Sequence, residues 1–158
     1  MKGIDVAKWN GVIDWKKVKE DGVQFAVLKA INKQCKVEDS FNRNYEGALS
    51  VGLPIDVYNY SYATTVSKAT SDAQAVLNAI KGKKVGTVWL DVEDKIQMNL
   101  GMTLIDIINA YKYIIEKAGY GFGVYTGLSF YNTLIKPYHS FLDCKFWIAR
   151  YPIGAVVD

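Results

Sequence analysis

Two acidic residues, Asp91 and Glu93, stand at the end of an apolar run that begins at Thr87 and continues Val-Trp-Leu. A run of this kind predicts a strand that is buried on both faces, as in a parallel sheet. Because side chains alternate along a strand, both acids should reach one surface, about 6.6 Å apart at roughly 3.3 Å per residue. Crowding and burial can separate the proton affinities of two such carboxyl groups, so that one stays protonated while the other is ionised. Cleavage of a glycosidic bond requires a pair of this kind.

A structural role is the alternative for these acids, since carboxylates also cap helices or pair with lysines. Asp5 poses the same question, because it interrupts an apolar strand and is either a site residue or a cap for the turn at Trp9-Asn10-Gly11. Other polar and aromatic residues also fall at the carboxyl ends of predicted strands, which is the end that carries the active site in α/β barrels. They are the candidate substrate-binding residues Lys29, Tyr58, Tyr60, Tyr62, Tyr125 and Arg150.

Strand-like and helix-like segments alternate along the chain. Strands are expected over residues 3–7, 25–30, 54–62, 85–93, 123–126 and 145–151. Helices are expected over residues 13–19, 40–51, 68–80, 104–118 and 129–134, with Asp14 as an N-cap of the first helix and Gly22 as its stop. Repeated β-α units predict an α/β fold built on a parallel sheet or barrel, and no linker divides residues 1–158, so we expect a single domain.

The composition excludes several classes of function. Half of the 158 residues are hydrophobic, which is enough for one substantial core. The net charge of +3 is spread without a basic block, so nucleic-acid binding gains little support. No apolar run approaches the roughly 20 residues of a membrane span, and no apolar signal region follows Met1. We therefore expect synthesis in the cytoplasm without a signal peptide.

Metal and thiol chemistry have little support in the sequence. Cys35 and Cys144 form no CxxC motif, and with His139 as the single histidine a zinc site has too few ligands. We expect neither a metal nor a cofactor. A disulfide between the two cysteines stays open, although reduced thiols fit a reducing compartment better.

The tyrosines at positions 58, 60 and 62 alternate along one predicted strand and should share one face. Their rings could stack on sugar faces while their hydroxyl groups donate hydrogen bonds. Core packing is the alternative, although a buried row would leave hydroxyl groups in need of partners. For Trp15 and Trp147 we expect core packing.

The order of motifs over nearly the whole chain resembles glycoside hydrolase family 25, the family of phage and bacterial lysozymes. The matching segments are Gly3-Ile4-Asp5-Val6, Trp9-Asn10-Gly11, Ile13-Asp14-Trp15-Lys16-Lys17-Val18-Lys19, Gly22-Val23-Gln24-Phe25-Ala26-Val27, Asn44-Tyr45-Glu46-Gly47-Ala48, Tyr58-Asn59-Tyr60-Ser61-Tyr62-Ala63, Val88-Trp89-Leu90-Asp91-Val92-Glu93, Gly123-Val124-Tyr125-Thr126 and Phe146-Trp147-Ile148-Ala149-Arg150-Tyr151.

The resemblance implies a modified α/β barrel that acts at the bacterial cell wall, in host-cell lysis or wall remodelling. Its substrate would be the peptidoglycan glycan strand, cut at the β-1,4 bond between N-acetylmuramic acid and N-acetylglucosamine. Glu93 corresponds to the general acid, Asp91 and Asp5 to the flanking acids, and Tyr60 to a residue of the groove. To hold its proton, Glu93 should occupy the more desolvated or more negatively crowded position. The second partner of the reaction is a carboxylate nucleophile, a carboxylate that activates water, or the substrate's N-acetyl group.

The chain departs from the family pattern at three places. Asn59 stands where the family often has histidine, and Ala7 replaces a common serine. The sequence also ends at Asp158, before two further strands of the family and an active-site aspartate that one of them carries. We therefore expect a barrel without its last two strands, with an open edge that favours a homodimer. The alternatives to a muramidase are a non-catalytic wall-binding or remnant domain and a glycosidase for another N-acetylated polymer.

Overall fold

A computed structural model describes residues 1–150. Six strands alternate with helices: β1 (Gly3–Val6), α1 (Trp15–Glu20), β2 (Phe25–Lys29), α2 (Phe41–Ser50), β3 (Ile55–Tyr60), α3 (Val66–Ile80), β4 (Thr87–Asp91), α4 (Met102–Lys117), β5 (Gly121–Gly127), α5 (Leu128–Phe130) and β6 (Lys145–Ala149). Short turns of other helix types join them: η1 (Lys8–Asn10), η2 (Lys95–Gln97) and η4 (Lys136–Phe141) are 3₁₀ turns, and η3 (Tyr131–Ile135) is a π-helical turn.

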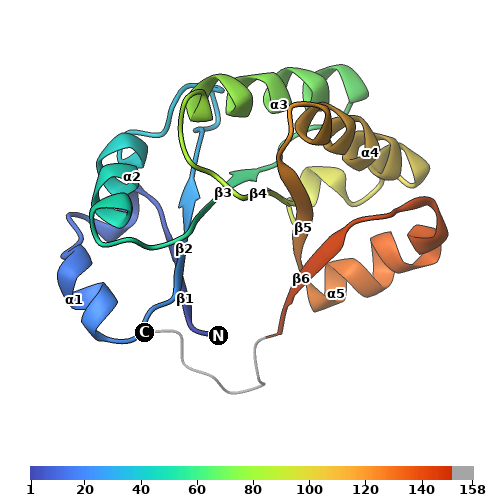
Figure 1. The fold of residues 1–158 in the computed structure, drawn as a ribbon. Helices are drawn as coiled ribbons and strands as arrows, with labels where there is room; N and C mark the ends of the chain where they lie inside the picture. The colour runs from blue at the N-terminus through green and yellow to red at the C-terminus, as the bar shows by residue number, and fades with distance from the viewer. Residues whose placement is uncertain (151–158) are drawn as a thin grey trace.

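The strands form one parallel sheet in the order in which they occur in the chain. Figure 1 shows that the sheet curls into an arc, with β1 and β6 at its two ends and the helices along its outer side. Among the described residues β1 and β6 are not paired with each other, so the sheet is a half-barrel. The expected α/β class and barrel-like sheet without closure are confirmed.

The outer face of the sheet carries the hydrophobic core. Its strand residues are apolar and almost fully buried, among them Leu28, Val57, Leu90 and Val124. Helices α3 and α4 pack on each other and cover the central strands. Alternation sends the remaining strand residues to the inner, concave face. There the register pairs Tyr60, Asp91, Tyr125 and Trp147 across four neighbouring strands, which therefore bring these side chains to one side.

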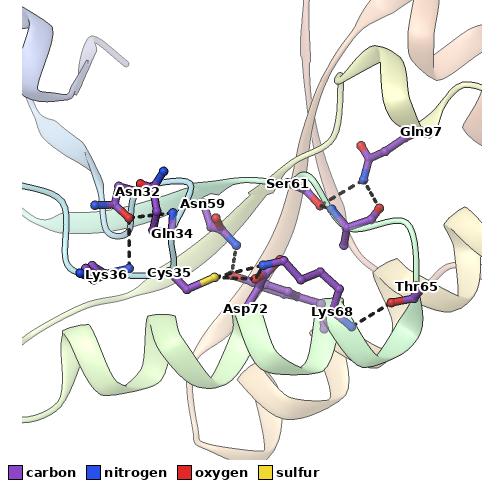
Figure 2. Close-up of polar contacts among 12 residues, drawn as sticks. Asn32, Gln34, Cys35, Lys36, Asn59, Ser61, Thr65, Lys68, Asp72 and Gln97 are labelled. Carbon is purple, nitrogen blue, oxygen red and sulfur yellow. Dashed lines mark hydrogen bonds and ion pairs between the residues drawn. The ribbon is translucent and has the colours of Figure 1, made fainter.

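Side-chain caps and buried polar contacts hold the outer layer in place. As expected, Asp14 caps α1, accepting a hydrogen bond from the backbone N–H of Lys17 at 3.2 Å. In Figure 2, Cys35 contacts Lys68 and Asp72 on α3, with its Sγ atom 3.1 Å from Lys68 Nζ and 3.0 Å from Asp72 Oδ1. These contacts fix the turn after β2, where Cys35 has a left-handed backbone with a φ of 60°.

Several predicted boundaries were wrong. The fourth and third strands end at Asp91 and Tyr60, two residues earlier than expected in each case. The fourth ends early because Asp94 turns the chain out of the sheet, accepting a hydrogen bond from Ile96 N at 3.0 Å at the start of η2. The helix expected over residues 129–134 is instead a single α turn followed by π and 3₁₀ turns. The predicted end of the sixth strand, Tyr151, lies outside the described residues.

The expectation of core packing is confirmed for one tryptophan and wrong for the other. Trp15 is buried in the core. Trp147 is half-buried on the concave face, because its strand position pairs with Tyr125 rather than with the outward-facing residues. Both cysteines are free thiols. Within residues 1–150, none of the helices combines the length and the apolar character that spanning a bilayer requires.

The burial of α4 generates a prediction about stability. Ile108→Ala should lower the free energy of unfolding by about 2–5 kcal/mol, because the truncation leaves a cavity in the core beneath this helix. Tyr113→Ala, on the exposed side of the same helix, is the control and should change it by less than about 0.5 kcal/mol. Urea unfolding measures both variants. Equal losses would show that the face of α4 carrying Ile108 is not part of the core.

The two sheet edges generate a prediction about association. Both β1 and β6 have a single strand neighbour within residues 1–150, and unpaired strand edges favour pairing with another chain. We expect two copies to associate as a C2 dimer through these edges. Light scattering over a concentration series measures the molar mass, and a monomer at every concentration would contradict the expectation.

Candidate active site on the concave face

A pocket of about 180 Å³ opens on the concave face. Its walls come from all six strands and from the loop after β4. The lining residues are Asp5, Val27, Tyr58, Trp89, Asp91, Glu93, Tyr125 and Trp147. The three acids predicted from the sequence therefore lie in one pocket together with two of the predicted tyrosines. Parallel strands end at the same side of a sheet, which explains why residues so far apart in the chain converge.

Asp91, the last residue of β4, is the most perturbed acid of the pocket. It is 7% exposed, and its Oδ1 atom accepts no hydrogen bond within the described residues. Burial first, and then the charge of Glu93 and a hydrogen bond with that residue, raise the pKa of Asp91 to about 8. Lys29 acts in the opposite direction by favouring the carboxylate. The pair formed by Asp91 and Glu93 therefore retains a proton at neutral pH.

Glu93 occupies the exposed rim of the pocket, two residues beyond the end of β4. Of the two positions expected for Glu93, the more desolvated one is occupied by Asp91, because β4 ends at Asp91 and the chain then carries Glu93 outward; that part of the expectation was wrong. The expectation that both acids reach one surface is confirmed. The structure thus contains one buried acid and one accessible acid that share a site.

The structural alternatives for these acids do not hold in residues 1–150. The loop after β1 is closed by Asn10, whose Oδ1 atom accepts a hydrogen bond from Ala7 N at 2.8 Å, while Asp5 lines the pocket. The cap after β4 is Asp94, not Asp91 or Glu93. The ion pairs between side chains in this part of the chain involve other acids.

The predicted tyrosines divide into two groups. Tyr58 and Tyr125 line the pocket, and burial together with the charges of Asp5 and Asp91 raises the pKa of Tyr58. Tyr60 and Tyr62 do not line it. Their rings are 4.9 Å apart, and the Tyr60 hydroxyl donates a hydrogen bond to Asp94 Oδ2 at 3.1 Å. These two form an aromatic pair beside the acid-bearing loop.

The two predicted basic residues do not line the pocket. Lys29 is half-buried at the end of β2 and acts on the site through its charge. Arg150 is exposed directly after β6. Asn59 is buried on the opposite side of β3 and donates a hydrogen bond to the Tyr111 hydroxyl at 3.3 Å, so this departure from the family pattern changes no pocket contact.

The sequence reasoning missed the aromatic floor of the pocket. The Trp147 ring lies 5.7 Å from Trp89, 5.4 Å from Tyr125 and 6.5 Å from Phe25, in edge-to-face contacts. Gly123 makes room for this floor, because a Cβ atom there would lie 2.4 Å from the Trp89 ring. Trp89 and Asp91 are two residues apart on one strand, and this spacing indicates that both side chains lie on the concave face.

This arrangement can carry out acid-base chemistry on a ring-shaped polar substrate. An accessible carboxyl group on the rim can donate a proton, and a second carboxylate, Asp5, faces the same space from β1. Aromatic rings on the floor offer flat apolar surfaces. Within residues 1–150, no cluster of three or more His, Cys, Asp or Glu residues could hold a metal ion.

Comparisons with known proteins agree with this geometry. The model of glycosyl hydrolases family 25 matches residues 4–157. The autolytic lysozyme of Clostridium acetobutylicum is 30% identical over 159 residues, which cover 98% of this chain and 46% of the relative. This chain therefore spans about half the length of that protein.

Two solved structures show a similar fold. The modular autolysin LytC of Streptococcus pneumoniae, solved with a synthetic peptidoglycan ligand, is 28% identical with a TM-score of 0.75, covering 85% of this chain and 34% of LytC. The catalytic domain of endolysin ply40 from bacteriophage P40 of Listeria monocytogenes has a TM-score of 0.80 at 24% identity, covering 97% of this chain and 75% of ply40. Since the family match extends over almost the whole sequence, the chain belongs to glycosyl hydrolases family 25.

Proposed function

We propose that this protein is a peptidoglycan muramidase, which hydrolyses the β-1,4 bond between N-acetylmuramic acid and N-acetylglucosamine. The observation that carries the proposal is the pocket that brings Asp5, Asp91 and Glu93 together above an aromatic floor. Membership in family 25 supports a glycosidase, and the relatives named as a lysozyme and as an autolysin with a peptidoglycan ligand support the substrate. The role would be host-cell lysis or wall remodelling.

In this mechanism Glu93 is the general acid and delivers the proton to the leaving glycosidic oxygen. Its position on the rim gives it access to the glycan, whereas Asp91 lines the pocket with only 7% of its surface exposed. Asp91 instead stabilises the protonated state of the pair, because two neighbouring carboxylates repel each other. The proton passes from Glu93 to the leaving oxygen as the glycosidic C–O bond breaks; water then supplies the hydroxyl group of the new reducing end and returns a proton to the carboxyl pair. Asp5 supplies a negative charge toward the positive charge that develops on the sugar ring.

The aromatic residues would bind the glycan. Trp89 and Trp147 present ring surfaces on the floor of the pocket, and Tyr58 and Tyr125 add hydroxyl groups on its wall. Tyr60 and Tyr62 extend the aromatic surface beyond the pocket, and Lys33 lies 4.7 Å from the Tyr62 ring. The charge of Lys29 lowers the pKa of Asp91 and so limits the rise that burial and Glu93 cause. Arg150 is proposed to contact the glycan outside the pocket.

A wall-binding domain without catalysis is the second candidate. It is favoured by the unclosed sheet within residues 1–150, which leaves the aromatic face open. Incubation with purified cell wall separates the two candidates. A muramidase releases new reducing ends, whereas a binding domain sediments with the wall and releases none.

Glu93→Gln should abolish the release of reducing ends while leaving the fold unchanged, because the amide keeps the shape but has no proton to give. General acid catalysis is typically worth about 10²–10⁴ in rate. Glu46→Gln, an exposed glutamate on α2, is the matched control and should keep the wild-type rate. Circular dichroism checks the fold of both variants. A rate for Glu93→Gln within about tenfold of wild type would remove Glu93 from the role of general acid.

The buried acid predicts a change in stability with pH. Burial, and then Glu93, raise the pKa of Asp91 from its ordinary value of 3.8 to about 8 in the folded chain. The folded state therefore binds this proton more tightly, so the free energy of unfolding should fall as the pH rises from about 4 to about 8. Asp91→Asn removes this proton-binding contribution. The free energy of unfolding of the variant, relative to that of wild type, should therefore increase as the pH rises through that range.

Urea unfolding of wild type and Asp91→Asn at pH 5 and at pH 8 measures the effect. The relevant quantity is the difference between the two proteins, because every other titrating group is common to both. A difference that stays constant between the two pH values would show that Asp91 has an ordinary pKa in the folded chain.

A further inference from the structure

The hydroxyl group of Thr126 contacts the backbone that carries Glu93. Its Oγ1 atom donates a hydrogen bond to the carbonyl oxygen of Val92 at 2.6 Å, and both residues are fully buried. That carbonyl belongs to the peptide bond that joins Val92 to Glu93. Thr126 itself does not line the pocket, so any effect on the chemistry acts through this peptide.

The strand ladder supports the acid-bearing segment only up to this point. The carbonyl of Asp91 accepts a hydrogen bond from Ser61 N, and Val92 N donates one to the carbonyl of Tyr125, both at 2.9 Å. Strand β4 ends at Asp91, so regular pairing does not continue to Glu93. The side chain of Thr126 extends the support by one more peptide.

The next residue of β5 lies beneath the carboxylate of Glu93. A Cβ atom on Gly127 would lie 4.0 Å from Glu93 Oε2, which is an ordinary van der Waals contact. Thr126 thus contacts the backbone before Glu93, and Gly127 leaves space next to the end of the Glu93 side chain.

The far end of the same loop is held independently. Gln97 is fully buried, and its Nε2 atom donates hydrogen bonds to Ser61 Oγ at 3.1 Å and to the carbonyl of Ala63 at 2.9 Å, as Figure 2 shows. Residues between Val92 and Gln97 therefore span two buried anchors, and the Tyr60 hydroxyl group holds Asp94 between them. Thr126 is the anchor on the strand side of Glu93.

The residue type at position 126 is unexpected for its place in the fold. Phe122 and Val124, which share its face of β5, are apolar and buried in the core. Valine has the shape of threonine and would cost less to bury, because a buried hydroxyl group needs a hydrogen-bond partner. The partner that Thr126 finds is the Val92 carbonyl.

We propose that Thr126 is a positioning residue that holds Glu93 at the rim of the pocket through the Val92 carbonyl. The inference rests on the proposed function of Glu93 as general acid. Small displacements of a catalytic group can cost about 10²-fold in rate. Loss of the one buried hydrogen bond to the backbone before Glu93 should therefore lower the rate measurably.

Replacement of the hydroxyl group alone tests the proposal. Thr126→Val should lower kcat on a soluble peptidoglycan fragment by about 10- to 100-fold while KM changes little, because the substrate does not touch position 126. Thr126→Ser keeps the hydroxyl group and should restore kcat to within a few-fold of wild type. Val124→Ala, on the same face of β5, is the control for loss of stability and should keep the wild-type kcat per folded molecule.

A second measurement does not depend on catalysis. Carboxyl ¹³C NMR follows the titration of Asp91 and Glu93 in the same variants. In Thr126→Val, Glu93 is free to move away from Asp91, so the pKa of Asp91 should fall toward its ordinary value, whereas Val124→Ala should leave it unchanged.

The two readouts separate the inference from the function on which it rests. A wild-type chain that releases no reducing ends would overturn the muramidase proposal, and the titration would then still decide the role of Thr126. A Thr126→Val variant with the wild-type titration and, where the chain is active, the wild-type kcat would overturn the positioning role.

Discussion

The register of β4 between β3 and β5 is the constraint on which the site depends. It places Asp91 opposite Tyr60 on one neighbour and opposite Tyr125 on the other. A shift by one residue would exchange the two faces of β4 and send Asp91 into the helix-covered core. The apolar neighbours Leu90 and Val92 make that exchange costly, because both are buried on the helix side. The hydrophobic core thus determines where the acid points.

Burial then gives the two acids different properties. Asp91 is still within the sheet and loses contact with solvent, whereas Glu93 lies beyond the strand and keeps it. Burial of Asp91 raises its pKa, and the nearby charge of Glu93 adds to the rise. The difference between a buried and an accessible carboxyl group follows from the point at which β4 ends. Asp94 sets that point by capping the turn that follows.

Polar groups on the outer side of the sheet support this arrangement. Ser61, Gln97 and Thr126 are all buried, and each contacts the backbone or a side chain near a strand end. Buried polar groups are costly unless they are paired. Their hydrogen bonds link the segment from Asp91 to Gln97 to the ends of β3 and β5.

The sequence alone determined the alternation of strands and helices, the parallel sheet, the family, and the three acids that meet in the pocket. These follow from periodicity and motifs, which are local in the chain. Only the tertiary structure decided that Asp91 rather than Glu93 is desolvated, that Trp147 forms the pocket floor, and that Lys29 acts at a distance. Burial depends on where a strand ends and on which residues lie opposite across the sheet. Both depend on contacts between segments far apart in the sequence, which no local pattern contains.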